Sequence, residues 1–266
     1  MKGRRIRIDF TSVAGVPVSI GLILLGQAIE GGSIKSIMQF TAALIVFGGT
    51  LGAVLLSFSM NDVKQAAFAL KTVFLWDGEP PARTIETVMQ FATKARSGGI
   101  LSLEDLLPTV DDPFLRKALS AVVDGASPHT MREMLETENQ RREEHDEIPA
   151  KVYEAAGGYA PTVGILGAVL GLIQIMQNMA DPSKLGAGIA VAFVATVYGV
   201  GSANLIFLPA ATKLKMKARH EGRRRELMLE GVLAIQEGLN LQIIQEKLRG
   251  YAAQADQEPA KRPRAA

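Results

Sequence analysis

The stretch of sequence that decides the fold is Tyr159–Pro209. It reads YAPTVGILGAVLGLIQIMQNM, then a short polar loop, then LGAGIAVAFVATVYGVGSANLIFLP. No charged side chain occurs between Glu154 and Asp181, or between Lys184 and Lys213. Each uncharged window is long enough for a helix of about 20 residues to cross a lipid bilayer. The sequence therefore predicts a hairpin of two membrane-spanning helices.

Small residues recur along both helices of this hairpin at three- and four-residue steps. They are Gly164, Gly167 and Gly171 on the first helix, and Thr196, Gly199 and Ala203 on the second. Such steps put them on one face of each helix, where a neighbouring helix can approach closely. The hairpin also carries polar side chains at Thr162, Thr196, Tyr198, Ser202 and Asn204. Two interpretations stay open: the polar groups bond back to their own helices, or the hairpin lines a path for an ion.

Composition argues against most soluble functions. The chain has 266 residues, is 48% hydrophobic and has a mean hydropathy of +0.17, which is too apolar for an ordinary soluble domain. The net charge of +2 gives no general case for binding nucleic acid, and cysteine is absent. The three histidines lie in polar segments, and no glycine-rich phosphate loop, nucleophile elbow or HExxH pattern occurs. We therefore expect neither an enzyme nor a resident cofactor or metal.

Two further spans are predicted near the N-terminus. The basic segment MKGRRIRIDF precedes an uncharged window, which resembles the start of a signal peptide. No small-residue cleavage site follows it, and a second uncharged window comes a few residues later, so we expect a retained helix. The four spans are predicted at about residues 13–28, 38–58, 158–178 and 187–209.

The remaining sequence is charged and amphipathic. Residues 61–155 are predicted to form a cytoplasmic helical domain that begins with an interfacial helix at 61–76, anchored by Phe68, Val73, Phe74 and Trp76. Residues 211–250 are predicted to form C-terminal cytoplasmic helices, and 251–266 a disordered tail. The expected fold class is an all-α polytopic membrane protein with four transmembrane helices, a helical cytoplasmic domain and no β-sheet.

Basic residues predict the orientation of the spans. The two short hairpin loops carry one lysine each, Lys35 and Lys184, whereas the N-terminus, the central region and the segment after Pro209 carry many. Because basic residues favour the cytoplasmic side, both termini and the central domain are expected in the cytoplasm.

The uncharged windows also limit the mechanism. A transmembrane ion path normally needs an ionisable or strongly coordinating group inside the membrane. None of the four windows holds Asp, Glu, Lys, Arg or His. If the chain conducts ions through a binding site, a partner helix must supply the carboxylate, and several copies are needed to enclose the path.

Four motifs together resemble one family. They are GGSI followed by LIVFGGTLGAVL in the second span, ARSGGILSLED in the central region, PTVGILGAVLGLI in the third span and GIAVAFVATVYGVGSANLIFLP in the fourth. Their order over about residues 10–250 is similar to that of the MotA/PomA family, the larger stator subunit of the bacterial flagellar motor.

The resemblance implies a function and an assembly. Five copies of the chain would surround two copies of a single-span partner of the MotB/PomB type, whose membrane aspartate binds the coupling ion. Ion passage through the bacterial inner membrane would then rotate the ring, and the cytoplasmic domain would exert torque on the rotor protein FliG.

The resemblance also assigns site residues. Pro161 and Pro209 match the two functional prolines of the family, and Thr196 matches the fourth-span threonine beside the ion-bearing carboxylate. Thr162 and Tyr198 are further candidates for the ion path. Arg96 and Glu104, across the glycine pair of ARSGGILSLED, match the two charges that engage the rotor.

The coupling ion is predicted from one position. Sodium-driven PomA-type members place a threonine in the third span where this sequence has Ala168. Sodium prefers oxygen ligands, whereas a proton needs only a titrating acid and water. We therefore expect proton coupling, with a sodium-driven PomA-type stator as an alternative.

Two other hypotheses for the function remain. Proteins of the ExbB/TolQ type, which energise outer-membrane processes with the proton gradient, resemble the third and fourth spans but have three spans. The uncharged window Phe10–Ile29 and the Arg96/Glu104 motif argue against that assignment. A passive scaffold that transports nothing is the third reading.

Overall fold

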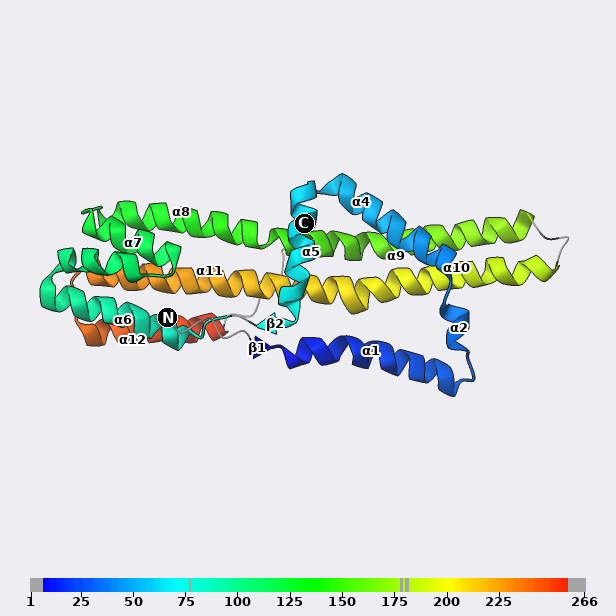
Figure 1. Ribbon diagram of the computed structural model, residues 1–266, viewed down its shortest axis with the longest axis horizontal. Helices are drawn as coiled ribbons and strands as arrows, with labels where there is room; N and C mark the ends of the chain where they lie inside the picture. Colours follow the sequence, from blue (N-terminus) through cyan, green and yellow to red (C-terminus); the bar gives the residue numbers. More distant parts are fainter. Residues whose placement is uncertain (1–6, 77, 178, 180–181, 258–266) are drawn as a thin grey trace. The chain divides into compact units, whose positions relative to one another are not determined.

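The computed structural model describes residues 7–76, 78–177, 179 and 182–257 (Figure 1). The chain divides into two compact units. The first, here called the span unit, comprises residues 1–77 and 146–216, and the second, here called the polar unit, comprises residues 78–145 and 217–266.

Helices form almost all of the span unit. Its elements before the polar unit are β1 (Arg7–Ile8), α1 (Phe10–Ile29), α2 (Ile34–Ile37), α3 (Phe40–Ala43), the π-helix η1 (Leu44–Gly48), α4 (Gly49–Ser57), α5 (Met60–Val73) and β2 (Leu75–Trp76). Its later elements are α9 (Ile148–Gln177), α10 (Pro182–Ser202), the π-helix η3 (Ala203–Phe207) and the beginning of α11 (Leu208–Gln236).

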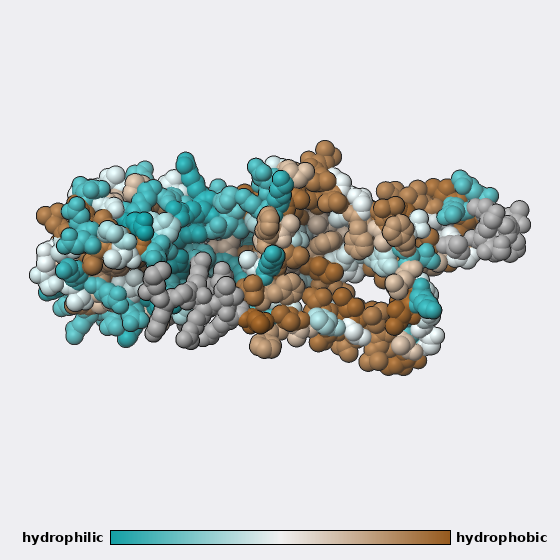
Figure 2. Space-filling model, in the orientation of Figure 1, coloured by the Kyte–Doolittle hydropathy of each residue, from teal (hydrophilic) through white to brown (hydrophobic). Residues whose placement is uncertain are grey.

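Among the described residues, four helical segments are long and apolar enough to cross a membrane, which confirms the predicted number of spans. The first is α1, the second runs from Ile34 to Ser57, the third contains α9, and the fourth begins at Gly188 within α10. The surface over α1 and α4 is predominantly apolar (Figure 2). The second span is not one regular helix, because Met38 and Gln39 interrupt it between α2 and α3 and a π-helical stretch follows.

The small residues predicted to lie on one face of each helix form the contact between α9 and α10. This line of contact is here called the seam. A Cβ atom added at Gly199 would lie 2.5 Å from the carbonyl oxygen of Ala160, and one at Gly164 would lie 2.9 Å from that of Ala195. At the other end of the seam, a Cβ at Gly171 would lie 2.9 Å from the carbonyl oxygen of Gly188. The two backbones therefore approach so closely that any side chain at these positions would displace the neighbouring helix.

One feature departs from the expectation of no strand. Arg7–Ile8 and Leu75–Trp76 form a two-stranded antiparallel pair, with Arg7 opposite Trp76 and Ile8 opposite Leu75. The pair closes because the backbone leaves α5 at Phe74, whose carbonyl accepts a hydrogen bond of 3.0 Å from the Asp9 N–H. Two residues per strand do not alter the all-α class, but they fix the segment that leads into α1.

The polar unit is built from α6 (Pro81–Gly98), the 3₁₀ helix η2 (Ile100–Thr109), α7 (Pro113–Val123), α8 (Pro128–Asp146), the part of α11 after Met216, and α12 (Leu241–Gln257). Leucine, phenylalanine and methionine side chains from these helices form one apolar core. Its fully enclosed members include Leu103, Phe114, Leu119, Met131, Leu233 and Leu248.

The domain boundaries differ from the predicted ones in three places. Helix α5 packs against α9 in the span unit, whereas the sequence placed residues 61–155 in one cytoplasmic domain. The C-terminal helices join the core of the polar unit instead of forming a separate segment after residue 211. Finally, α12 continues to Gln257, so residues 251–257 are helical rather than disordered. Tyr251 explains this last difference, because its side chain packs against the apolar core; the rest of the predicted tail, 258–266, lies outside the described residues.

Candidate ion path and rotor-contact turn

Three of the predicted ion-path residues share one side of the α9–α10 hairpin. Pro161 and Ala168 each lie one residue beyond a seam position of α9, and Thr196 lies one residue beyond Ala195, which faces Gly167. Each is therefore rotated by about 100° from its seam neighbour. Because α9 and α10 run antiparallel, equal rotations from the two facing seams point to the same side of the hairpin. Ala168 and Thr196 also lie at the same level, since a Cβ at Gly167 would be 2.7 Å from Cβ of Ala195.

The hydroxyl groups of the hairpin bond to their own helices. Thr196 Oγ1 donates to the Ala192 carbonyl at 3.3 Å, and Thr162 Oγ1 donates to the Tyr159 carbonyl at 2.8 Å. A hydroxyl that donates one hydrogen bond keeps its acceptor lone pairs. The half-buried Thr196 can therefore accept a hydrogen bond from a group on the side of the hairpin that it shares with Pro161 and Ala168. This side is here called the open side, because the second span packs on the other side, against Val194 and Tyr198. Thr162 is exposed, and it lies well away from the side that carries Pro161 and Ala168.

Tyr198 lies on the opposite side of α10, where it contacts the second span. Its hydroxyl donates a 2.6 Å hydrogen bond to the Ile37 carbonyl and accepts one of 3.3 Å from the Gln39 N–H. Its ring stacks on that of Phe47, with the centroids 5.9 Å apart. The structure thus does not bring Tyr198 together with Thr196. The hydroxyl instead satisfies two backbone groups that the interruption at Met38–Gln39 leaves without helical partners.

The two candidate prolines have different surroundings. Pro161 is half-buried within α9, and this helix continues without a break from Ile148 to Gln177. Pro209 is exposed and is the second residue of α11, directly after η3. At that junction the Leu208 N–H bonds to the Ala203 carbonyl, five residues back, which marks a widened turn. The neighbouring Leu208 side chain packs on Gly157, one turn before Pro161 in α9.

Ion pairs of the span unit lie where the chain leaves its uncharged windows. Lys213 Nζ lies 2.7 Å from Asp9 Oδ2 and 3.3 Å from Thr11 Oγ1, and Lys215 Nζ lies 3.3 Å from Glu154 Oε1. The bonds from Lys213 and Thr11 hold the pKa of Asp9 far below its usual range. Among the described residues, no group of three or more His, Cys, Asp or Glu side chains could hold a metal ion.

The predicted rotor-contact residues flank a tight turn in the polar unit. Helix α6 ends at Gly98, and Gly99 adopts the positive φ of 76° that favours glycine. The Ser102 hydroxyl donates to the carbonyls of Gly99 at 2.7 Å and Lys94 at 3.2 Å, which ties η2 to the last turn of α6.

Arg96 and Glu104 themselves are exposed on this turn. Between them, Leu103 is fully buried in the core and fixes the orientation of η2. No described residue forms an ion pair with either Arg96 or Glu104. Their charges are therefore held on a rigid support and are available to a partner.

Sequence reasoning missed the buried charges that brace this unit. The Arg224 guanidinium contacts Asp112 at 2.5 Å, Glu221 at 3.0 Å and Glu79 at 3.6 Å, and it is only 10% exposed. Asp112 also caps α7 by accepting from the N–H groups of Phe114 and Leu115. Burial alone would raise the pKa of Asp112, but Arg224 and these N–H groups outweigh it and keep the pKa below its usual value.

A second buried acid joins three helices. Glu230 on α11 lies 2.7 Å from Arg132 on α8 and 2.9 Å from Lys247 on α12. These two bonds lower the pKa of Glu230 in spite of its burial. The signal that could have revealed it is the single acid within the apolar run LMLEGVLAI, residues 227–235. Arg224 gave no such signal, because the sequence places it in a run of basic residues beside a span.

Comparison with known proteins covers both units. Residues 107–227 match the MotA/TolQ/ExbB proton channel family, and residues 13–99 match the motility protein A N-terminal family, which includes the first two spans. Motility protein A of Bacillus subtilis (strain 168) is 35% identical over 94% of this chain and 93% of its own length.

Solved structures of flagellar stators are also similar to this chain. The flagellar MotAB stator complex from Bacillus subtilis contains a chain that is 34% identical, with a TM-score of 0.83 over 94% of this chain and 97% of that chain. The MotAB structure from C. jejuni matches with a TM-score of 0.86 and 29% identity over 97% and 99% of the two chains. The match to the N-terminal family excludes the three-span alternative. This multi-pass membrane protein therefore belongs to the MotA/TolQ/ExbB proton channel family, as a motility protein A subunit of a flagellar motor stator rather than an enzyme.

Proposed function

We propose that this chain conducts protons together with a single-span partner of the MotB type and converts their flow into torque on the rotor protein FliG. One observation carries the proposal. Ala168 and Thr196 lie at one level on an open side of the α9–α10 hairpin, with Pro161 two turns nearer the cytoplasmic end. The uncharged windows around them contain no Asp, Glu, Lys, Arg or His. A helix lying on that side would bring its own acid beside the Thr196 hydroxyl.

The partner supplies what the chain lacks. A membrane aspartate of the partner would bind the coupling ion, because Asp, Glu, Lys, Arg and His are absent from the four uncharged windows of the spans. The similar complexes are MotAB stators, which supports a MotB-type partner and an oligomer. Five copies of this chain around two partners is the arrangement that the family resemblance implies.

The coupling ion is a proton in this proposal. The Ala168 side chain carries no oxygen, so at this level the Thr196 hydroxyl would be the one side-chain oxygen of the pair that could bind a desolvated cation. A sodium ion needs several oxygen ligands, whereas a proton needs only the partner's carboxylate and water. Swimming speed should therefore fall with a protonophore and persist when sodium is removed. Loss of swimming on sodium removal would assign sodium instead.

Orientation and rotor contact complete the proposal. The excess of basic residues outside the two short loops favours an inner-membrane protein with both termini in the cytoplasm. Arg96 and Glu104 would then contact charges of opposite sign on FliG from the exposed turn between α6 and η2. Neither charge has a competing partner among the described residues.

The test of the ion path compares two threonines on the same hairpin. The variant Thr196→Val keeps the side-chain volume but removes the hydroxyl, and it should slow proton uptake by roughly tenfold when the partner is co-reconstituted. The matched control is Thr162→Val, which removes an exposed hydroxyl from a different side of the hairpin. Equal uptake by both variants would contradict the assignment of the open side.

A separate test addresses the rotor contact. The charge reversals Arg96→Glu and Glu104→Lys should each abolish most swimming while proton uptake stays normal, because they lie on the polar unit. Reversing Glu136 to Lys on exposed α8 serves as the control. Normal swimming by both turn variants would remove this part of the proposal.

A further inference from the structure

Helix α5 directly follows the uncharged window of the second span, where charged residues begin again in the sequence. It contacts α9 through a cluster that contains Val54, Ala66, Val152 and Ala156, and the Tyr153 hydroxyl donates to the Ala66 carbonyl at 3.1 Å. These contacts begin beside Lys151 and Glu154 and end where the uncharged window of α9 starts. Within the span unit, α5 runs crosswise to α9 (Figure 1). Because α9 is long and apolar enough to cross the membrane, we infer that α5, crosswise to it at the end of its uncharged window, lies along the membrane surface.

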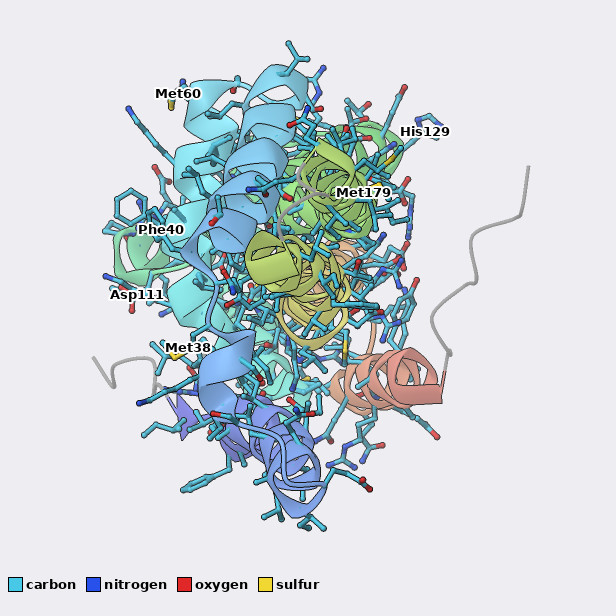
Figure 3. The ribbon with its side chains drawn as sticks, turned by 90° about the vertical axis from the view of Figure 1, so that its right-hand side faces the viewer. Met38, Phe40, Met60, Asp111, His129 and Met179 are labelled. Carbon is cyan, nitrogen blue, oxygen red and sulfur yellow. The ribbon has the colours of Figure 1, made fainter. Side chains whose placement is uncertain are left out.

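The two faces of α5 have different chemistry. Ala66 and Val73 are buried against the rest of the span unit. The opposite face carries Met60, 58% exposed, and Phe68, 71% exposed. Figure 3 shows Met60 at the outer edge of the span unit. Two apolar side chains on an exposed face beside a span fit the boundary between headgroups and acyl chains.

Two lysines lie on this same exposed face. Lys64 and Lys71 are seven residues apart, which is two helical turns, and both are exposed. No ion-pair partner for either lysine exists within the described part of the chain. The carboxylate of the nearby Asp62 points to the start of α5, where it accepts hydrogen bonds from the Ser59 hydroxyl at 2.7 Å and the Ser59 N–H at 3.2 Å in the capping box.

We propose that α5 binds the headgroups of anionic phospholipids through Lys64 and Lys71, while Met60 and Phe68 enter the adjacent acyl region. Cations on a membrane-surface helix attract anionic lipid, and each adds to the preference for it. The inference goes beyond the proposed function. It rests on that function only for the orientation that places α5 at the cytoplasmic leaflet.

The absence of cysteine from the sequence provides a clean test. The variant Ala67→Cys introduces one thiol on the exposed face, one turn from each lysine, and a fluorophore attached there reports local lipid. The complex with its partner is reconstituted in vesicles of phosphatidylcholine that contain either quencher-labelled phosphatidylglycerol or quencher-labelled phosphatidylcholine. The ratio of the two association constants measures the preference for anionic lipid.

We expect phosphatidylglycerol to be preferred by roughly thirtyfold at low ionic strength, about fivefold for each lysine. The double variant Lys64→Gln with Lys71→Gln should lower the ratio to about one. The double arginine variant at the same positions keeps the charges and should preserve the preference. Lys35→Gln removes one exposed lysine from the loop between the first two spans and should leave the ratio unchanged.

Two results would overturn the proposal. One is a preference that survives in the glutamine variant. The other is a fluorophore that neither labelled lipid quenches, because a second copy of the chain or another protein would then cover the face. Proton uptake is measured in the same vesicles, so normal uptake without lipid preference contradicts only the lipid proposal. Absent uptake with a clear preference contradicts only the proposed function.

Discussion

The span unit and the polar unit are both helical, but different interactions hold them together. In the span unit, α9 and α10 meet backbone to backbone along glycines, and no charged side chain lies between them. In the polar unit, the helices meet through large apolar side chains, and two buried ion networks surround Arg224 and Glu230.

This difference has a functional consequence. A unit packed through backbone contacts can keep its membrane interior free of charge, which fits our proposal that a partner supplies the titrating acid. A unit braced by buried ion pairs can hold the exposed charges Arg96 and Glu104 on a fixed support. The comparison predicts that one unit is sensitive to side-chain volume and the other to the loss of charge.

The largest expected effect is from one methyl group in the seam. In Gly199→Ala the new Cβ would lie 2.5 Å from the Ala160 carbonyl oxygen, and neither backbone can move without opening the hairpin. We expect most of the folded complex to be lost, since overpacking of this kind costs about 3 kcal/mol or more. Size-exclusion chromatography after membrane extraction measures this loss. Gly201→Ala, on the same helix but with open space around it, should assemble normally.

The next effect is specific to the polar unit. Arg224→Gln leaves Asp112, Glu221 and Glu79 without their shared cation and should destabilise the unit by about 2–3 kcal/mol, less than for fully buried pairs because the three carboxylates are partly exposed. Hydrogen exchange of amides in α7 measures the change. Removing the exposed pair Arg132–Glu136 through Glu136→Gln should cost less than about 0.5 kcal/mol. Equal costs for the two variants would contradict the contrast between buried and exposed pairs.

The seam between α9 and α10 could be predicted from the sequence, but the ion networks of the polar unit could not. Glycines at three- and four-residue steps indicate a close helix contact within a short stretch of sequence. The spans and their seam could therefore be predicted from the amino-acid sequence alone. Three partners of Arg224 and Glu230, namely Glu79, Asp112 and Arg132, lie about a hundred residues or more away in sequence, and their pairing depends on the tertiary fold. The same limit explains the missed strand pair, which joins residues on either side of two spans.

The residues of the candidate ion path could also be predicted only in part. The positions of Thr196, Ala168 and Pro161 on one side follow from helical periodicity once the hairpin is known to be antiparallel. Tyr198 was grouped with them because it is polar and close in sequence. Its contact with Ile37 could not be foreseen, since the interruption of the second span at Met38 and Gln39 has no marker such as proline.

Acid should weaken the polar unit before the uncharged middle of the α9–α10 hairpin, because the Asp9–Lys213 pair of the span unit lies outside that part of the hairpin. The pKa values of Asp112 and Glu230 are lower in the folded chain than in the unfolded chain, so their ion pairs stabilise the fold above the usual carboxyl pKa. This stability is lost as the pH falls through about 4 and below. Hydrogen exchange measured at pH 6 and pH 3.5, and corrected for the intrinsic pH dependence of amide exchange, should show lower protection at pH 3.5 in α7 and in α11 beyond Met216. Protection in the middle of α9 should change little. Uniform protection at both pH values would contradict the assignment.

The smallest predicted effect is from the Tyr198 hydroxyl. Tyr198→Phe removes two hydrogen bonds to the interrupted backbone of the second span but keeps the ring against Phe47. The loss should be about 1–2 kcal/mol, and it should appear as faster exchange of the Gln39 amide without loss of assembly. Unchanged exchange at Gln39 would show that the hydroxyl does not hold the interruption.

The central claim is that the titrating acid of the ion path belongs to another chain. Proton uptake by vesicles that contain this protein alone, compared with vesicles that contain it together with the MotB-type partner, tests that claim most directly. We predict uptake only with the partner present, and its loss when the partner's membrane aspartate is replaced by asparagine. Full uptake by the protein alone would contradict the account.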